Sequence, residues 1–201
     1  MSRSFGITFD YLCPFARNAN EHVVTGLRAG AAWDVTFVPY SLAQGHVEEG
    51  QPDVWDREGK AASGVLALQI GITVRDRFPA RFLDVHEAIF AARHDQGADI
   101  KDGSVLRGVL DAAGLDADEV FEAVDDGTAL KLLREEHDAG VRDHGVWGVP
   151  TFITDARSVF VRLMDRPAGD AVVAQQRIEQ VVDLVNGTLE LHEFKQVDLT
   201  V

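Results

Sequence analysis

The order of apolar and polar positions near the N-terminus predicts a strand, a helix and a second strand. Apolar residues dominate positions 5–12 and form the first predicted strand. After Pro14 a helical face begins, with apolar residues every four positions until Gly30 ends it: Phe15, Ala19, Val23 and Leu27. Apolar and polar residues then alternate over 33–38, before Pro39. This order is typical of a βαβ unit, which has parallel strands and a right-handed crossover.

The strand pattern is absent between positions 54 and 145, where the apolar spacing is helical. We expect a first helix within 54–70 that Gly71 breaks, and a new helix that Pro79 begins. No repeat, low-complexity tract or flexible linker interrupts this stretch. The pattern therefore predicts an all-helical insertion that packs on the strands around it.

The strand pattern resumes over 146–153 and again over 158–163, with a short polar turn between, so this pair reads as an antiparallel hairpin. A helix follows from about Asp170 and ends at Gly187. The tail, 188–201, alternates weakly and is interpreted as a short extra strand or an arm. The chain is therefore predicted to be an α/β protein with one structural unit in three parts: an N-terminal βαβ part over 1–53, a helical insertion over 54–145, and a C-terminal ββα part with the tail over 146–201.

Composition narrows the function classes. The formal net charge of −14 argues against a nucleic-acid partner and against an electrostatic membrane anchor, because both need clustered Lys and Arg. No apolar run is long enough to cross a membrane, and the N-terminus lacks the pattern of a signal peptide. A single cysteine forms no intramolecular disulfide. We therefore expect a cytoplasmic protein without membrane contact.

The only cysteine, Cys13, stands between the first predicted strand and the helix that begins at Pro14. Proline is favoured at a first helical position because the amide there has no partner within the helix. A thiol at this point lies in the field of the helix N-terminus, which favours its thiolate. The position therefore predicts a reactive thiol, with a buried and inert cysteine as the alternative.

Two short segments carry a resemblance to a known family. The first is Asp-Tyr-Leu-Cys-Pro-Phe-Ala over 10–16, and the second is Gly-Val-Pro-Thr-Phe over 148–152. Together with the element order, they resemble the DsbA-like branch of the thioredoxin superfamily, which includes the 2-hydroxychromene-2-carboxylate isomerases and kappa-class glutathione transferases. The resemblance implies a thioredoxin fold with a helical insertion between the second and third strands. It also implies a cis bond before Pro150, beside which the backbone of Val149 binds an extended thiol-bearing substrate.

The sequence departs from this family at Ala16, where the relatives keep a second cysteine. Without it, no disulfide can store two electrons within the motif, so a redox cycle needs an outside sulfur. The first hypothesis is a DsbA-family thiol-disulfide oxidoreductase that acts through Cys13 alone. It would use an external low-molecular-weight thiol, such as glutathione, and no tightly bound cofactor. Its partners would be small thiols or disulfides.

Two other functions stay open. In the isomerase and kappa-class relatives, the position equivalent to Cys13 activates the sulfur of bound glutathione, so a thiol-cofactor-dependent isomerase or transferase is the second hypothesis. The third is a non-catalytic thioredoxin-fold binding protein that kept the fold after losing the second cysteine. The sequence does not name the substrate or the thiol. A homodimer through the insertion or the C-terminal arm is compatible with it.

The remaining candidates surround Cys13 or are excluded by spacing. Tyr11 and Phe15 are expected to border the site, and Trp147 to line a substrate groove, with core packing as the alternative for each. Asp10 is either a buried acid that tunes the thiol or a surface cap. The seven histidines form no metal-binding spacing and no cysteine pair exists, so no metal site is expected.

Overall fold

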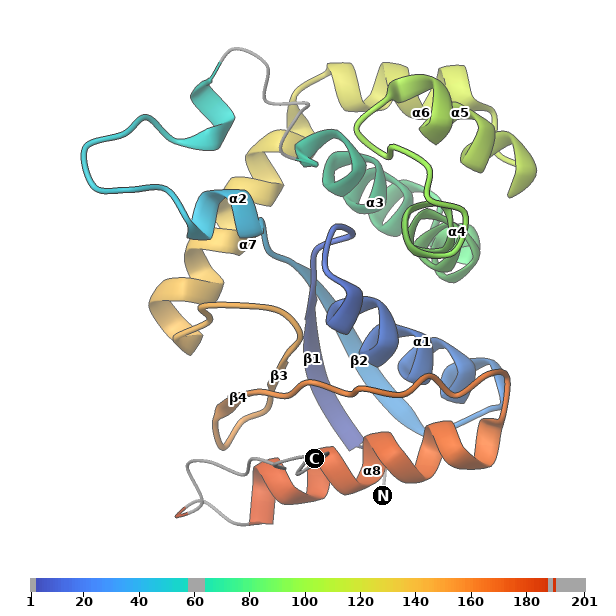
Figure 1. Cartoon of the computed structure of the whole chain (residues 1–201), viewed down its shortest axis with the longest axis vertical. Coiled ribbons are helices and arrows are strands. Elements are labelled where there is room, and N and C mark those ends of the chain that lie inside the picture. The colour runs from blue at the N-terminus through green and yellow to red at the C-terminus, as the bar shows by residue number, and fades with distance from the viewer. Residues whose placement is uncertain (1–2, 58–63, 188–189, 191–201) are drawn as a thin grey trace, which may run out of the picture.

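Four strands form one mixed sheet in the order β2-β1-β3-β4 (Figure 1). The computed structural model describes residues 3–57, 64–187 and 190. The strands are β1 (Arg3–Phe9), β2 (Trp33–Pro39), β3 (Thr151–Ile153) and β4 (Ser158–Phe160). β1 pairs with β2 in parallel, β1 with β3 antiparallel, and β3 with β4 antiparallel. The predicted βαβ unit and the predicted hairpin are therefore confirmed, and the arrangement is that of a thioredoxin fold.

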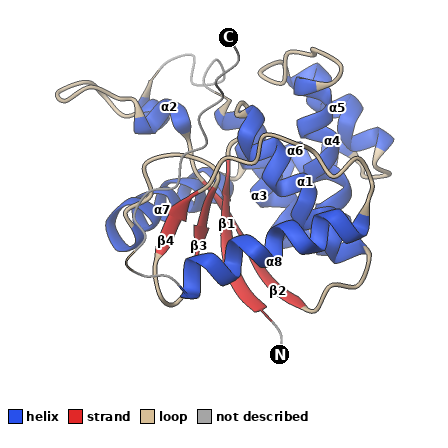
Figure 2. Cartoon of the chain, turned by 60° about the horizontal axis from the view of Figure 1, so that its bottom comes forward, coloured by secondary structure: helices blue, strands red, loops and turns tan. Residues whose placement is uncertain are grey.

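Helices cover both faces of this sheet. α1 (Pro14–Arg28) and α8 (Ala171–Gly187) pack together, and Figure 2 shows α8 crossing in front of the strands. Side chains alternate between the two faces of a strand, so Ser4 and Gly6 of β1 point away from the face that buries Ile7. They face α7 (Thr128–His144), which lies on the opposite side of the sheet.

The segment between β2 and β3 is helical, as the sequence analysis predicts. In Figure 1 its helices occupy the upper part of the molecule. Besides α7 they are α2 (Leu42–Gly45), η1 (Val54–Asp56), α3 (Val65–Arg77), η3 (Pro79–Arg81), α4 (Phe82–His94), α5 (Gly103–Ala112) and α6 (Ala117–Asp125). The part of the first predicted helix over 58–63, and the tail except residue 190, lie outside the described residues. The exact boundaries of the three predicted parts stay a prediction.

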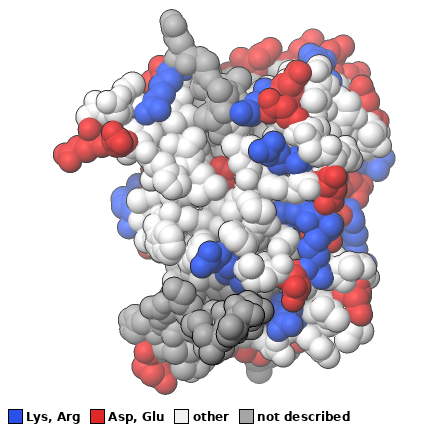
Figure 3. Space-filling view, in the orientation of Figure 1, with Lys and Arg blue, Asp and Glu red and all other residues white. Residues whose placement is uncertain are grey.

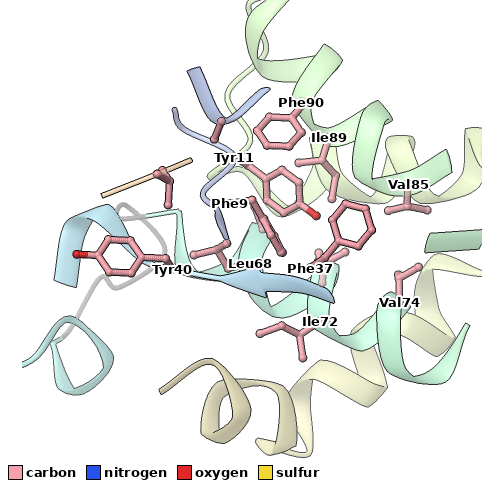
Figure 4. Close-up of a cluster of buried hydrophobic side chains, with 14 of the residues drawn as sticks. Phe9, Tyr11, Phe37, Tyr40, Leu68, Ile72, Val74, Val85, Ile89 and Phe90 are labelled. Atoms are coloured by element: carbon pink, nitrogen blue, oxygen red, sulfur yellow. The ribbon is translucent and has the colours of Figure 1, made fainter. Parts of the chain in front are cut away.

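A single hydrophobic core joins the sheet to the inserted helices. Figure 4 shows the ring of Tyr11, just beyond β1, between Phe9 and Phe90. The ring centroids of Tyr11 lie 5.2 Å from Phe9 and 4.8 Å from Phe90, which belongs to α4. Tyr11, which follows β1, is therefore packed against a helix of the insertion.

Strand lengths differ from the prediction for identifiable reasons. β1 ends at Phe9 because residues 10–13 form a turn, in which the Cys13 amide donates to the Asp10 carbonyl. β3 begins only at Thr151, and β4 ends at Phe160 rather than at position 163. Pro150 has no amide hydrogen to donate, so the ladder between the two strands stops there.

The predicted helix break at Gly71 is wrong, because Gly71 lies inside α3. A Cβ built on Gly71 would stand 2.5 Å from the Tyr11 hydroxyl oxygen. The glycine is therefore required by the close approach of the Tyr11 ring, and tertiary packing overrides its low helix propensity. Pro79 begins η3 rather than a full helix, and α4 follows at Phe82.

The surface is mixed in charge, with an acidic excess. Figure 3 shows Asp and Glu gathered over α5 and α6, in the upper right of that view. Within the described part of the chain, no helix combines the length and the apolar character needed to cross a bilayer.

Gly71→Ala should destabilise the protein, since the added methyl group must displace the Tyr11 hydroxyl. We expect the free energy of unfolding to fall by about 1–3 kcal/mol in denaturant titrations. Gly108→Ala, in the open interior of α5, is the matched control because a Cβ there meets no atom within 4 Å. It should instead stabilise by about 0.5–1 kcal/mol through helix propensity. Equal effects of the two substitutions would contradict the packing argument.

Candidate active site

The thiol of Cys13 brings the two predicted motifs together. Cys13 is the N-cap of α1, with extended backbone, and its Sγ accepts a hydrogen bond from the Ala16 amide at 3.4 Å. The thiol also donates to the Val149 carbonyl oxygen, again at 3.4 Å. Cys13 is buried, with 7% of its surface exposed. Two segments 136 positions apart therefore meet at one sulfur atom.

Hydrogen bonds hold the backbone around Val149 in place, and the Val149 amide is left as a free donor among the described residues. The Val149–Pro150 peptide bond is cis, the isomer that the sequence analysis expects. The Thr151 amide donates to Thr8 Oγ1 at 2.7 Å, and the Thr151 hydroxyl donates to the Gly148 carbonyl at 2.8 Å. No group of the described residues accepts a hydrogen bond from the Val149 amide. The site therefore offers an amide donor next to the thiol.

The amides at the helix N-terminus favour the Cys13 thiolate, as the sequence analysis expects, but burial of the thiol outweighs them. Burial raises the pKa of the Cys13 thiol above its usual value. The amides of Ala16 and Phe15 lower that pKa, and the charge of Asp10 raises it, but desolvation is the largest effect. The resting thiol is therefore mainly neutral at pH 7, which agrees with its hydrogen bond to the Val149 carbonyl.

The sequence analysis leaves two roles open for Asp10, a buried acid or a surface cap, and the structure shows the buried acid. Its side chain is 1% exposed and accepts hydrogen bonds from the Leu12 amide at 2.9 Å and the Leu42 amide at 2.8 Å. Desolvation raises the pKa of Asp10 to about 6, although both hydrogen bonds favour the charged form. Asp10 therefore joins the turn before Cys13 to the start of α2.

Tyr11 is packed in the core, which is the alternative that the sequence analysis gives for it. It is 1% exposed, and its hydroxyl forms a 2.9 Å hydrogen bond with His86 Nδ1. His86 Nε2 lies 3.0 Å from Asn20 Oδ1, and the Asn20 amide group donates to the Ala16 carbonyl at 2.8 Å. His94 Nε2 contacts the Tyr11 carbonyl at 2.9 Å. Two histidines of α4 therefore hold the Cys13 turn and the first turn of α1.

His86 acts in this network as a neutral ring. Complete burial lowers its pKa to about 3. One ring nitrogen can then donate and the other accept, which suits a partner on each side. The sequence analysis counted His86 only among the seven histidines that form no metal-binding spacing. A histidine at position 86 is compatible with ordinary packing, so pattern alone did not reveal the network.

The other predicted residues lie around the thiol but differ in exposure. Pro14 is exposed at the first helical position, and Val149 and Pro150 are buried. Phe15 is half-buried, with the Arg162 guanidinium 5.3 Å from its ring centroid. Trp147 is 69% exposed, which excludes the core-packing alternative for it. The sequence analysis missed Arg162, because a lone arginine near a strand carries no distinctive pattern.

Two hollows of the described structure lie away from the thiol. One of about 860 Å³ separates α7 from the sheet face that carries Ser4 and Gly6. Another of about 210 Å³ lies between α1 and α4, where Arg17 pairs with Asp95. Neither is lined by Cys13, Val149 or Pro150. Among the described residues, no group of three or more His, Cys, Asp or Glu side chains is placed to hold a metal ion.

The sheet order and the capping thiol beside Pro150 define a thioredoxin-fold protein with one cysteine at the motif position. The chain belongs to the family of DSBA-like thioredoxin domains, whose model matches residues 7–185.

Sequence and structure comparisons agree with this assignment. The chain is 30% identical over 167 residues to the uncharacterised protein Rv2286c of Mycobacterium tuberculosis. This alignment covers 82% of this chain and 70% of that protein. A 2-hydroxychromene-2-carboxylate isomerase matches with a TM-score of 0.61 and 16% identity, covering 92% of this chain and 98% of the isomerase. The cytosolic disulfide reductase DsbM of Pseudomonas aeruginosa matches with a TM-score of 0.60 and 18% identity, covering 90% and 100%. These two structures show the shared fold.

Asp10→Asn should change how stability depends on pH. An acid whose pKa rises on folding binds its proton more tightly in the folded state, so stability falls as pH rises between the two pKa values. For Asp10 these are 3.8 and about 6. Between about pH 4 and 6, the wild type should lose about 2 kcal/mol of unfolding free energy relative to Asp10→Asn.

The control for this measurement is Asp102→Asn, at the exposed N-cap of α5, where the carboxyl pKa is lowered instead. Its stability curve should run parallel to that of the wild type between pH 4 and 6. Parallel curves for the wild type and Asp10→Asn would contradict a buried carboxyl that titrates near pH 6.

His86→Leu should destabilise the folded protein, because it leaves the Tyr11 hydroxyl and the Asn20 side chain buried without their partner. We expect a loss of about 2–4 kcal/mol in the free energy of unfolding, measured with denaturant. His144→Leu, at an exposed position of α7, should change it by no more than about 0.5 kcal/mol. Similar losses in both variants would show that the network does not carry the effect.

Proposed function

We propose that this protein is a thiol-disulfide oxidoreductase that acts through Cys13 alone, with an external low-molecular-weight thiol such as glutathione. One observation carries the proposal: Cys13 Sγ lies between the Ala16 amide and the Val149 carbonyl. The amide can stabilise a thiolate, and the backbone of Val149 can align a substrate beside it. Ala16 supplies no second sulfur.

The reaction has two exchange steps. Cys13 first loses its proton to solvent, and its thiolate attacks one sulfur of a disulfide. A bond forms to that sulfur while the disulfide bond breaks, and the other sulfur leaves with the electron pair as a thiolate. An external thiolate then attacks the substrate sulfur of this mixed disulfide, forms a disulfide with it and releases Cys13 as a thiolate. In total, one half of the substrate leaves as a thiol, and the other half leaves as a mixed disulfide with the external thiol.

The residues around the sulfur have separate roles in this scheme. Pro14 begins the helix, so that the amides of Phe15 and Ala16 point at the developing negative charge. An incoming substrate would take the place of the Val149 carbonyl as the partner of the sulfur, while the Val149 amide donates to the substrate backbone. A cysteine without an intramolecular partner suits a reducing compartment such as the cytoplasm.

The similar structures support both leading functions by name. One is described as a cytosolic disulfide reductase with GSH and the other as a 2-hydroxychromene-2-carboxylate isomerase. A specific observation favours the isomerase or transferase alternative as well: burial keeps the Cys13 thiol neutral. A neutral thiol can donate a hydrogen bond to the sulfur of a bound thiol cofactor, which would then be the reacting group.

Intact mass after incubation with oxidised glutathione separates these functions. The wild type should gain one glutathione as a mixed disulfide at Cys13, and Cys13→Ser should gain none. The rate of Cys13 alkylation should rise with pH, with a midpoint above the value of about 8.5 for free cysteine, because burial raises its pKa.

Other outcomes select the alternatives. No adduct, together with tight binding of reduced glutathione that persists in Cys13→Ser, would reject the oxidoreductase and favour the isomerase or transferase. Neither adduct nor binding would leave a non-catalytic binding protein. Ala16→Cys is the positive control, since its new thiol should displace glutathione from the adduct and form an intramolecular disulfide.

A further inference from the structure

The hollow of about 210 Å³ between α1 and α4 is lined by charged side chains. The two helices pack against each other, with α4 above α1 in Figure 1. Its deepest lining residues are Asn20 and His86, both 0% exposed, and Phe90. At about 30 Å³ for each water molecule, it has room for about seven waters or for one small organic molecule. We call this hollow the α1–α4 pocket.

The segment between β4 and α8 lies along α1 and brings Arg166 to the pocket. Asn18 Nδ2 donates to two carbonyl oxygens of this segment, at 3.0 and 3.1 Å. Arg166 Nε donates to Glu21 Oε2, on α1, at 2.6 Å. The other two nitrogens of Arg166 lie 3.4 Å from the carboxylate oxygens of Asp95, the residue that follows α4. Arg166 therefore bridges the two helices beside the pocket.

Two guanidinium groups of the pocket keep donors without a strong acceptor. Arg17 is only 8% exposed, and its Nη2 pairs with Asp95 Oδ1. Within the part of the chain that the structure describes, nothing accepts a hydrogen bond from Arg17 Nε or Nη1. The 3.4 Å contacts of Arg166 exceed the usual N–H···O distances of about 2.7–3.2 Å. Because buried donors without a partner are costly, these groups favour an acceptor inside the pocket.

Two carboxylates of the same pocket keep an oxygen without a donor. Glu21 is bonded to Arg166, and Glu87 to Arg28, in each case through Oε2. No donor of residues 3–57, 64–187 or 190 bonds to Oε1 of either side chain. Burial raises the pKa of Glu87 and Arg28 lowers it, while the charge of Glu21 raises it further. The two carboxylates therefore act on each other, and their remaining oxygens favour a cation.

We propose that the α1–α4 pocket binds a small zwitterion that carries a carboxylate and an ammonium group close together, as an α-amino acid does. The carboxylate would accept hydrogen bonds from Arg17 and Arg166, whose planar guanidinium groups match its shape. The ammonium group would donate to the remaining oxygens of Glu21 and Glu87. A zwitterion adds no net charge to a pocket in which three carboxylates already face two arginines.

Leucine and two analogues of it test the class of ligand. Phe90 and Ala91 give the pocket an apolar wall that suits a small aliphatic side chain. Isocaproate is leucine without the ammonium group, and isoamylamine is leucine without the carboxylate. In isothermal titration calorimetry, leucine should bind saturably, and each analogue at least about tenfold more weakly, the size expected for losing a charge-assisted hydrogen bond. Absence of saturable leucine binding, or an analogue that binds as tightly, would overturn the inference.

Three substitutions test whether the ligand lies in this pocket. Arg166→Gln and Glu87→Gln should each weaken leucine binding about tenfold. Ala91→Leu fills the pocket without changing its charge and should abolish the binding. Arg177→Gln and Glu122→Gln, at exposed positions of α8 and α6, are the matched controls and should change the affinity by less than about twofold. Unfolding midpoints measured without leucine verify that each variant is folded. Unchanged affinity in the first three variants would overturn the inference.

Cys13→Ser separates this pocket from the thiol. Cys13 does not line the α1–α4 pocket, so Cys13→Ser should bind leucine with the affinity of the wild type. Loss of leucine binding in Cys13→Ser would place the ligand at the thiol and overturn the inference. The glutathione adduct of the wild type tests the oxidoreductase separately, so each of the two proposals can fail while the other holds.

Discussion

The contact between Cys13 Sγ and the Val149 carbonyl is the point on which the arrangement of the site depends. It exists because β1 and β3 are antiparallel neighbours, with Gly6 opposite Ile153 and Ile7 opposite Phe152. β1 delivers the thiol at its C-terminal end, and β3 begins beside it. Any change in the register of this pair would separate the sulfur from the backbone that is proposed to align its substrate.

Burial raises the pKa of the Cys13 thiol, whereas the helix N-terminus lowers it. The amides of α1 favour a thiolate, but removal from water disfavours it more, and the Asp10 carboxylate adds to the same direction. Asp10 is nevertheless part of the construction, since it ties the Cys13 turn to the start of α2. The resting protein thus holds a neutral thiol, and charge on the sulfur must develop when a substrate replaces part of the surroundings.

The helical insertion is part of the site's framework rather than an appendage. Its helix α4 supplies His86 and His94, which contact the side chain and the carbonyl of Tyr11, two residues before the thiol. Its helix α3 approaches the Tyr11 hydroxyl so closely that only glycine fits at position 71. Trp147, two residues before Val149, stays largely exposed, so close packing around Tyr11 is combined with an accessible ring near Val149.

The local pattern of the sequence determined much of the fold: the parallel βαβ unit, the helical segment after it, the hairpin, and the capping position of Cys13 before Pro14. These follow from periodicity and from the backbone limits of proline, which act over a few residues. The Tyr11–His86–Asn20 network, the interior position of Gly71 and the packing of Arg162 on Phe15 were decided only by the tertiary structure. Each depends on groups far apart in the chain, and whether a histidine, glycine or arginine has a partner is a property of packing in space.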